Sequence, residues 1–249
     1  MAIQPIMKYM DYKVAQYLIE LNHQFYQTFS AEFSETRQRL QPGVDRILDQ
    51  LDSQIRILDI GCGNGKLARA LARKDIACSY VGTDFSSDLL AHARENLPDD
   101  FAAHFLELDL TEDDWGKSLP PPPFDTIFAF ATLHHIPSQT LRLHTLREIR
   151  PHIKPDGVFY LSNWQFLNSP RLKKRVQPWE KVGLRERDVE EGDYLMDWRR
   201  GGYGLRYVHH FTPSELAALA EKSGYQVEGD FYSDGKEGNL GYYQVWKPS

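Results

Sequence analysis

The chain has 249 residues, 41% of them hydrophobic and 26% charged, which is the composition of a globular protein long enough for one large α/β domain. Its net charge of −6 argues against a nucleic-acid-binding surface spread over the whole molecule, so an anionic partner needs a local basic patch. The sequence has no apolar run of ~18 residues to span a membrane, only two cysteines and no metal-spaced Cys/His cluster, which together predict a cytoplasmic protein without disulfides or a metal site.

The first fifty residues have the hydrophobic pattern of helices. Apolar residues recur at helical spacing from Val14 to Phe25 and again from Val44 to Leu51. We expect residues 1–52 to form a helical cap on a single domain that spans residues 1–249.

From Ile55 onwards, short apolar runs alternate with amphipathic stretches. Such alternation predicts parallel strands joined by helical crossovers, which form a doubly wound sheet. The predicted strands are Ile55–Ile60, Ala77–Thr83, Ala103–Leu108, Phe124–Phe130 and Gly157–Trp164, and the predicted helices are Lys66–Lys74, Ser86–Leu97 and Gln139–His152.

The alternation stops at residues 165–211, which are polar, aromatic and poor in aliphatic periodicity. This segment is too long for a simple connection and predicts an insertion that covers the substrate. Regular structure is expected to resume at Thr212, where TPSE is a capping box with proline at the first helical position. After that helix, Tyr225–Phe231 and Leu240–Trp246 are predicted to add an antiparallel hairpin. The predicted fold class is therefore α/β, with a mostly parallel seven-stranded sheet.

The loop after the first predicted strand has three glycines at alternate positions, in the sequence GCGNG from Gly61 to Gly65. This spacing differs from the G-x-G-x-x-G of dinucleotide-binding loops. Asp59 lies just before the loop, where a carboxylate would repel a pyrophosphate and attract a cation. Asp84 ends the second strand, where an acid reaches ribose hydroxyls in nucleotide-binding sheets. A phosphate-free nucleoside with a positively charged arm, such as S-adenosylmethionine, satisfies these observations.

The chain resembles class I S-adenosylmethionine-dependent methyltransferases in the successive elements LDIGCGNG, VGTDFS, LELDL, FDTIFAFATLHHI and LREIRPHIKPDGVFYLSNW. The resemblance implies that this cofactor is bound, with its methionine arm along the glycines and its ribose on Asp84. It also implies that Phe85 packs on the adenine, whose amino edge Asp109 and Leu110 recognise. The cofactor-binding residues that it implies are Asp59, Gly61, Gly63, Gly65, Asp84, Phe85, Asp109, Leu110, Ala131, Leu133 and Tyr26.

The flanking segments resemble the tRNA wobble-uridine carboxymethyl methyltransferases, including the domains fused to AlkB-type hydroxylases. Ser30, Met196-Asp197 and Val208 depart from the pattern of that family. The resemblance implies that the methyl acceptor is a carboxylate of a modified uridine in tRNA. It rests on Tyr26, Phe33, Ser34, Thr36, Arg37, Leu133-His134-His135, Gly192-Asp193, Trp198 and the segment Arg206-Tyr207-Val208-His209-His210-Phe211.

The chemistry of such an acceptor points to arginine. A carboxylate is a nucleophile at neutral pH, so its methylation requires alignment and a cation rather than a general base. The guanidinium group offers a planar fork that matches a carboxylate. We therefore expect Arg206 and Arg37 to hold the acceptor, with Tyr207 and His209 as orienting donors. The alternative is that Arg206 lies on the surface or pairs with Asp193.

Several alternatives remain open from the sequence. The segment from Arg171 to Arg206 has ten basic against seven acidic residues. Its RLKKR cluster either contacts an RNA backbone, with help from an activating partner protein, or is a solvated helix end. The glycine loop is also compatible with a simple tight turn, and Asp84 and Asp109 with capping of the turns that follow. The alternatives to tRNA modification are a small-molecule O- or N-methyltransferase and a non-catalytic binding module.

Overall fold

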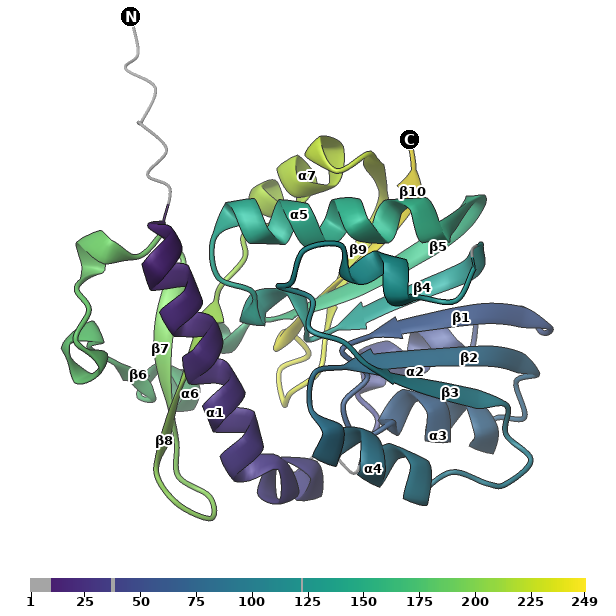
Figure 1. The fold of residues 1–249 in the computed structure, drawn as a ribbon, viewed down its shortest axis with the longest axis horizontal. Helices are drawn as coiled ribbons and strands as arrows, with labels where there is room; N and C mark the ends of the chain where they lie inside the picture. Colours follow the sequence, from purple (N-terminus) through teal and green to yellow (C-terminus); the bar gives the residue numbers. More distant parts are fainter. Residues whose placement is uncertain (1–9, 37–38, 122) are drawn as a thin grey trace, which may run out of the picture.

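The computed structural model describes residues 10–36, 39–121 and 123–249. A seven-stranded sheet with the order β3-β2-β1-β4-β5-β10-β9 forms the centre of the molecule (Figure 1). Five strands are parallel, and β10 pairs antiparallel with both β5 and β9. The predicted fold class and the final hairpin are thereby confirmed. The strands are β1 (Ile55–Ile60), β2 (Cys78–Asp84), β3 (Ala103–Glu107), β4 (Phe124–Phe130), β5 (Ile153–Trp164), β9 (Tyr225–Ser233) and β10 (Gly241–Pro248).

Helices cover both faces of the sheet (Figure 1). On one face lie α2 (Pro42–Leu48), α3 (Lys66–Arg73) and α4 (Ser87–Glu95), and on the other α5 (Gln139–Ile149) and α7 (Pro213–Lys222). Short 3-10 helices connect several elements: η1 (Trp115–Ser118), η2 (Leu133–His135), η3 (Arg150–His152), η4 (Phe166–Asn168), η5 (Trp179–Val182) and η6 (Glu186–Asp188).

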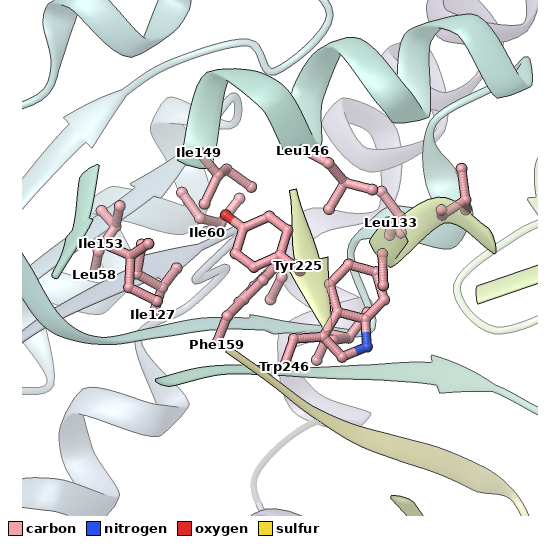
Figure 2. Close-up of a cluster of buried hydrophobic side chains, with 14 of the residues drawn as sticks. Leu58, Ile60, Ile127, Leu133, Leu146, Ile149, Ile153, Phe159, Tyr225 and Trp246 are labelled. Atoms are coloured by element: carbon pink, nitrogen blue, oxygen red, sulfur yellow. The ribbon is translucent and has the colours of Figure 1, made fainter. Parts of the chain in front are cut away.

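The apolar runs of the central strands are explained by burial on both faces. Figure 2 shows the core under α5, where Leu146 and Ile149 pack toward Phe159 of β5 and Trp246 of β10. The opposite face packs against α3 through residues such as Ile57, Leu71 and Phe128.

Hydroxyl side chains cap the helices that the sequence predicted to be capped. Ser86 accepts a hydrogen bond from the backbone N–H of Leu89 at the start of α4, and Thr212 accepts one from Glu215 at the start of α7. Each cap satisfies one of the backbone donors that a helix start leaves unpaired. These local signals fixed where both helices begin.

The expectation that residues 165–211 lack regular structure is wrong. They form a second, antiparallel sheet of β6 (Val176–Gln177), β7 (Asp193–Trp198) and β8 (Gly204–His209), together with the short helix α6 (Pro170–Lys173). The alternation was obscured because β7 and β8 bury polar residues as well as apolar ones, including Asp193, Asp197 and Arg206. We refer to residues 165–211 as the insertion.

The helix α1 (Tyr12–Thr36) joins the insertion to the rest of the molecule (Figure 1). Its residues Ala15 and Leu18 pack with Leu195 of β7 and Tyr207 of β8. The helix changes direction at Phe29, whose φ of −118° and ψ of 21° are not helical. In the described ranges, no helix is long and apolar enough to cross a membrane.

Candidate functional site

A cavity of about 300 Å³ lies at the carboxyl ends of the parallel strands, next to the point where the strand order reverses between β1 and β4. Open α/β sheets bind ligands at this position. The strand ends, α1 and β8 all contribute to its wall. Residues that line it include Asn22, His23, Tyr26, Asp59, Gly61, Gly63, Lys66, Asp84, Phe85, Asp109, Leu110, Ala131, His135, Asn163, Trp164 and Arg206.

The backbone conformation of the loop favours glycine at all three positions, and the surrounding atoms explain two of them. Gly61, Gly63 and Gly65 all have φ between 55° and 71°, a region in which side chains are unfavourable. A Cβ atom on Gly61 would lie 2.5 Å from Oγ1 of Thr132, whereas one on Gly63 would meet nothing within 4 Å. Gly63 therefore presents bare backbone beside open space in the cavity wall, as a ligand cradle requires. The simple-turn alternative does not account for that space.

Gly65 lies outside the cavity, although the sequence predicted that it lines the ligand. A Cβ atom there would lie 2.7 Å from the Cβ of Ala93, so this glycine allows α3 to begin close against α4. The expectation that all three glycines line the ligand is corrected to Gly61 and Gly63.

Two buried acids lie under the loop. Asp84 accepts hydrogen bonds from the backbone N–H of Gly63 at 2.9 Å and of Ser86 at 3.0 Å, so it joins the glycine loop to the N-cap residue of α4 and also lines the cavity. Asp59 accepts one from the Tyr80 hydroxyl at 2.5 Å. Burial raises the pKa of Asp84 to about 6 and, with the neighbouring charge of Asp84, that of Asp59 to about 7. Acids held this way are stabilised in their ionised form by a cation.

Phe85 and Asp109 lie together in the cavity wall, and a residue of α1 contacts both. The ring of His23 stacks on Phe85 with the centroids 4.4 Å apart and the planes 22° from parallel. Nε2 of His23 is 3.3 Å from Oδ2 of Asp109. Oδ1 of Asp109 accepts hydrogen bonds from the N–H and hydroxyl of Thr111, so the capping alternative holds for one oxygen and leaves the other facing the cavity.

Of two further residues predicted to bind the cofactor, one lines the cavity and the other does not. Ala131 lines the cavity with a φ of 56°. Leu133 points away from it and packs in the core with Leu146 (Figure 2). The prediction for Leu133 is therefore corrected, because η2 turns its side chain into the core.

Arg206 is buried in the wall of the same cavity, with 4% of its surface exposed. Its guanidinium carbon lies 5.1 Å from the ring centroid of Phe25, 5.4 Å from that of Trp164 and 5.9 Å from that of Trp198. Nη1 donates a hydrogen bond of 3.3 Å to the Tyr26 hydroxyl, and Nε is buried without a partner. Arg206 makes no ion pair with any residue that the structure describes, which removes the Asp193 alternative.

Tyr207 and His209 do not reach the cavity, although the sequence suggested them as acceptor donors. Side chains alternate along a strand, so both lie on the face of β8 opposite Arg206. Tyr207 donates to Asp193 at 2.6 Å, and the two ring nitrogens of His209 lie 2.7 Å from Asp193 and 2.9 Å from Glu215. Their role is corrected to holding β8 in place. Arg37 lies outside the described residues.

The sequence did not identify Asn22, His23 and His135 as residues of the site. Asn22 donates to the backbone oxygens of His135 and Tyr207 and accepts from the N–H of Tyr207 at 2.8 Å. These contacts join positions more than 100 residues apart, so no local motif announces them. The one available signal was the spacing of His23 and Tyr26, which places both on one face of a helix.

Comparisons with known proteins agree with this geometry. Residues 33–229 match the family model of a methyltransferase domain. A putative methyltransferase of Encephalitozoon cuniculi is 29% identical over 82% of this chain and 87% of its own length. A tRNA (carboxymethyluridine(34)-5-O)-methyltransferase of Arabidopsis thaliana is 28% identical over 57% of this chain, which corresponds to only 32% of the plant protein. The crystal structure of a SAM-dependent methyltransferase from Methanosarcina mazei superposes with a TM-score of 0.64 at 25% identity, covering 84% of this chain and 98% of that one.

Proposed function

Since this chain belongs to the family of methyltransferase domains and depends on S-adenosylmethionine, we propose that it methylates a carboxylate of a modified wobble uridine in tRNA. S-adenosylmethionine supplies an electrophilic methyl group and a positively charged amino acid arm. The remaining task of the protein is to bind, align and select the acceptor.

The residues of the cavity fit this cofactor. Gly61 and Gly63 would hold the methionine arm, because both line the cavity and Gly63 leaves bare backbone beside open space. Asp84 would accept hydrogen bonds from the ribose, and Asp59 would face the positive charge. Phe85, Asp109 and Leu110 would hold the base, with Ala131 and Tyr26 further along the wall.

The observation that supports a carboxylate acceptor is that Arg206 is buried and its Nε has no hydrogen-bond partner. Burying a charge without a partner is costly, and this guanidinium has an unpartnered Nε and aromatic rings on three sides. An anionic acceptor in the same cavity would relieve that cost through charge-assisted hydrogen bonds. A carboxylate meets this requirement and is already nucleophilic, so the described site needs no general base.

The insertion supports a nucleic-acid substrate. Arg171, Lys173 and Lys174 on α6 are exposed and make no ion pair with a described residue. We propose that residues 165–211 bind the acceptor side, that residues 1–52 cover the site, and that α6 contacts phosphates. The activity for which the plant relative is named agrees with this proposal, and the match covers 32% of that protein.

The alternative is a small carboxylic acid as acceptor, and the depth of Arg206 favours it. With 4% of its surface exposed among aromatic rings, the guanidinium leaves limited room for a polynucleotide. A small-molecule O-methyltransferase would use the same cavity and the same arginine. The two substrates therefore have to be separated by experiment.

The test is methylation of tRNA from cells that lack the gene, followed by mass spectrometry of the nucleosides. We expect the wild type to convert carboxymethyluridine into its methyl ester and Arg206→Ala to lose this activity by at least a hundredfold, which corresponds to about 3 kcal/mol. The same variant should bind S-adenosylhomocysteine within a few-fold of the wild type. Arg73→Ala, an exposed arginine at the end of α3 and outside the insertion, is the control and should remain active. Persistent activity of Arg206→Ala would contradict the carboxylate assignment, and methylation of small acids alone would favour the alternative.

A further inference from the structure

Four residues of α1 line the cavity, and two of them, His23 and Tyr26, lie three positions apart. His23 contacts Phe85 and Asp109, the proposed base subsite. Tyr26 contacts Arg206, the proposed acceptor subsite, and its ring also lies edge-on to Phe85 with the centroids 6.0 Å apart. One face of one helix therefore contacts both ligands of the proposed reaction.

On the cofactor side, His23 and Thr111 contact different oxygens of Asp109. Oδ1 of Asp109 accepts two hydrogen bonds from Thr111. Nε2 of His23 lies 3.3 Å from Oδ2, where a proton on this nitrogen gives an ion-pair contact. The ring of His23 lines the cavity together with Phe85 and Asp109.

On the acceptor side, the guanidinium of Arg206 has no acceptor atom, so it donates to the Tyr26 oxygen. The hydroxyl of Tyr26 also lies 2.8 Å from Nε2 of His135. Asn22, next to His23 in the chain, forms two hydrogen bonds with the backbone of Tyr207, the neighbour of Arg206 in β8. These contacts tie α1 and β8 together, and a shift of α1 changes the position of Arg206.

We propose that α1 couples the two subsites: His23 positions the base subsite and Tyr26 positions Arg206, so that filling the cofactor subsite fixes the orientation of the acceptor arginine. The acceptor half of this proposal rests on the function proposed above for Arg206. A base held by Phe85 and Asp109 would also contact His23, which lies against both residues. These added contacts would favour one position of α1. Coupling of this kind is reciprocal, so the acceptor strengthens cofactor binding by the same factor.

The first test is calorimetric titration with S-adenosylhomocysteine, which needs no acceptor. His23→Ala should weaken binding by about tenfold, as expected for the loss of the ring stacked on Phe85 and of the polar contact with Asp109. His23→Gln keeps a donor for Asp109 and should recover most of the affinity. Tyr17→Ala, an exposed residue of the same helix, is the control and should bind like the wild type. In the Asp109→Ala background, His23→Ala should reduce the affinity for S-adenosylhomocysteine much less than it does in the wild type. Full affinity of His23→Ala, or additive effects of the two changes, would overturn the role of His23.

The second test is hydrogen exchange with and without S-adenosylhomocysteine. In the wild type, the ligand should slow exchange in the glycine loop, in α1 and in β8. In saturated His23→Ala, the loop should still be protected, whereas α1 and β8 should exchange as in the free protein. Equal protection of α1 and β8 in both proteins, or its absence in the wild type, would overturn the coupling. Tyr26→Phe should leave protection of the loop and α1 intact and reduce that of β8, and unchanged β8 protection would contradict the role of Tyr26. Neither measurement uses the acceptor, so these outcomes do not depend on whether Arg206 binds a carboxylate.

Discussion

At the scale of single residues, the cavity combines groups of opposite charge from different parts of the chain. Asp59 and Asp84 come from the ends of β1 and β2, whereas Arg206 comes from the insertion. The buried acids suit the positively charged cofactor, and the buried guanidinium suits an anionic acceptor. This division agrees with the proposed transfer of a methyl group from a cationic cofactor to an anionic acceptor.

The raised pKa of Asp84 predicts how cofactor binding depends on pH. Ribose hydroxyls donate hydrogen bonds best to the ionised carboxylate, which predominates above a pKa of about 6. The affinity for S-adenosylhomocysteine should therefore fall by about tenfold per pH unit below pH 6, where the ionised fraction of Asp84 falls by that factor. Titrations from pH 5 to pH 8 check this, and Asp84→Asn should bind weakly with a flatter profile. Equal affinity of the wild type at pH 5 and pH 8 would contradict the assignment.

The raised pKa of Asp59 leads to a separate prediction about the stability of the ligand-free protein. Its pKa of about 7 exceeds the ordinary 3.8, so the folded state binds more protons than the unfolded state between pH 4 and pH 7. The contribution of Asp59 to the free energy of unfolding therefore falls as the pH rises through this window. Asp59→Asn removes the buried charge and should stabilise the protein at pH 8 by on the order of 4 kcal/mol, with little effect at pH 4. Urea denaturation at both pH values measures this, and a variant less stable than the wild type at pH 8 would refute it.

At the scale of elements, β8 shows how one strand serves two purposes. One face carries Arg206 to the cavity, and the other carries Tyr207 and His209 into a buried network with Asp193 and Glu215. Arg142 of α5 joins this network through Glu190 at 2.8 Å, which connects the insertion to the sheet domain. The network positions the strand, and the strand positions the arginine.

His209 should therefore matter for stability more than for ligand binding. His209→Ala leaves two carboxylates without their shared partner, and breaking buried pairs of this kind costs about 3–5 kcal/mol. Thermal denaturation should show a large loss, whereas the folded variant should bind S-adenosylhomocysteine within a few-fold of the wild type. His210→Ala is the matched control, since this neighbour makes no ion pair in the described part of the chain, and it should lose less stability. A His209→Ala variant as stable as the wild type would contradict the structural role.

At the scale of the whole molecule, charge is distributed unevenly. The chain carries a net charge of −6, yet the segment from Arg171 to Arg206 has more basic than acidic residues. The insertion lies to one side of the sheet, joined to it by α1 (Figure 1). This arrangement suits a large anionic substrate that contacts the insertion and extends one group into the cavity.

The corresponding prediction concerns salt. Lys173→Glu combined with Lys174→Glu should weaken tRNA binding at least tenfold at low ionic strength and reduce the slope of log K against log salt by about two. Filter binding at several salt concentrations measures both quantities. Lys222→Glu, at the end of α7 and away from the insertion, is the control and should bind like the wild type. Unchanged tRNA affinity of the double variant would remove α6 from the interface.

Local signals were sufficient for most of the fold and for half of the site. Apolar runs defined the parallel strands, and Ser86 and Thr212 fixed helix starts. Asp59, Gly61 and Gly63 lie within or beside one turn, and Asp84 lies at the end of the next strand. These features depend on the order and spacing of residues that are close together in the chain, which can be read directly from the sequence. The insertion was misjudged because burial of its polar residues depends on partners in distant segments.

The alternation of strands and helices, the glycine loop and the two acids near it could all be read from the residues alone. That Arg206 faces the cavity while Tyr207 and His209 face away, and that His23 and Tyr26 line the wall, became clear only in the folded protein. The orientation of β8 depends on contacts with Asn22 and Arg142, which lie 185 and 65 positions from Tyr207 along the chain. Such contacts leave no periodic pattern, and folding alone brings them together.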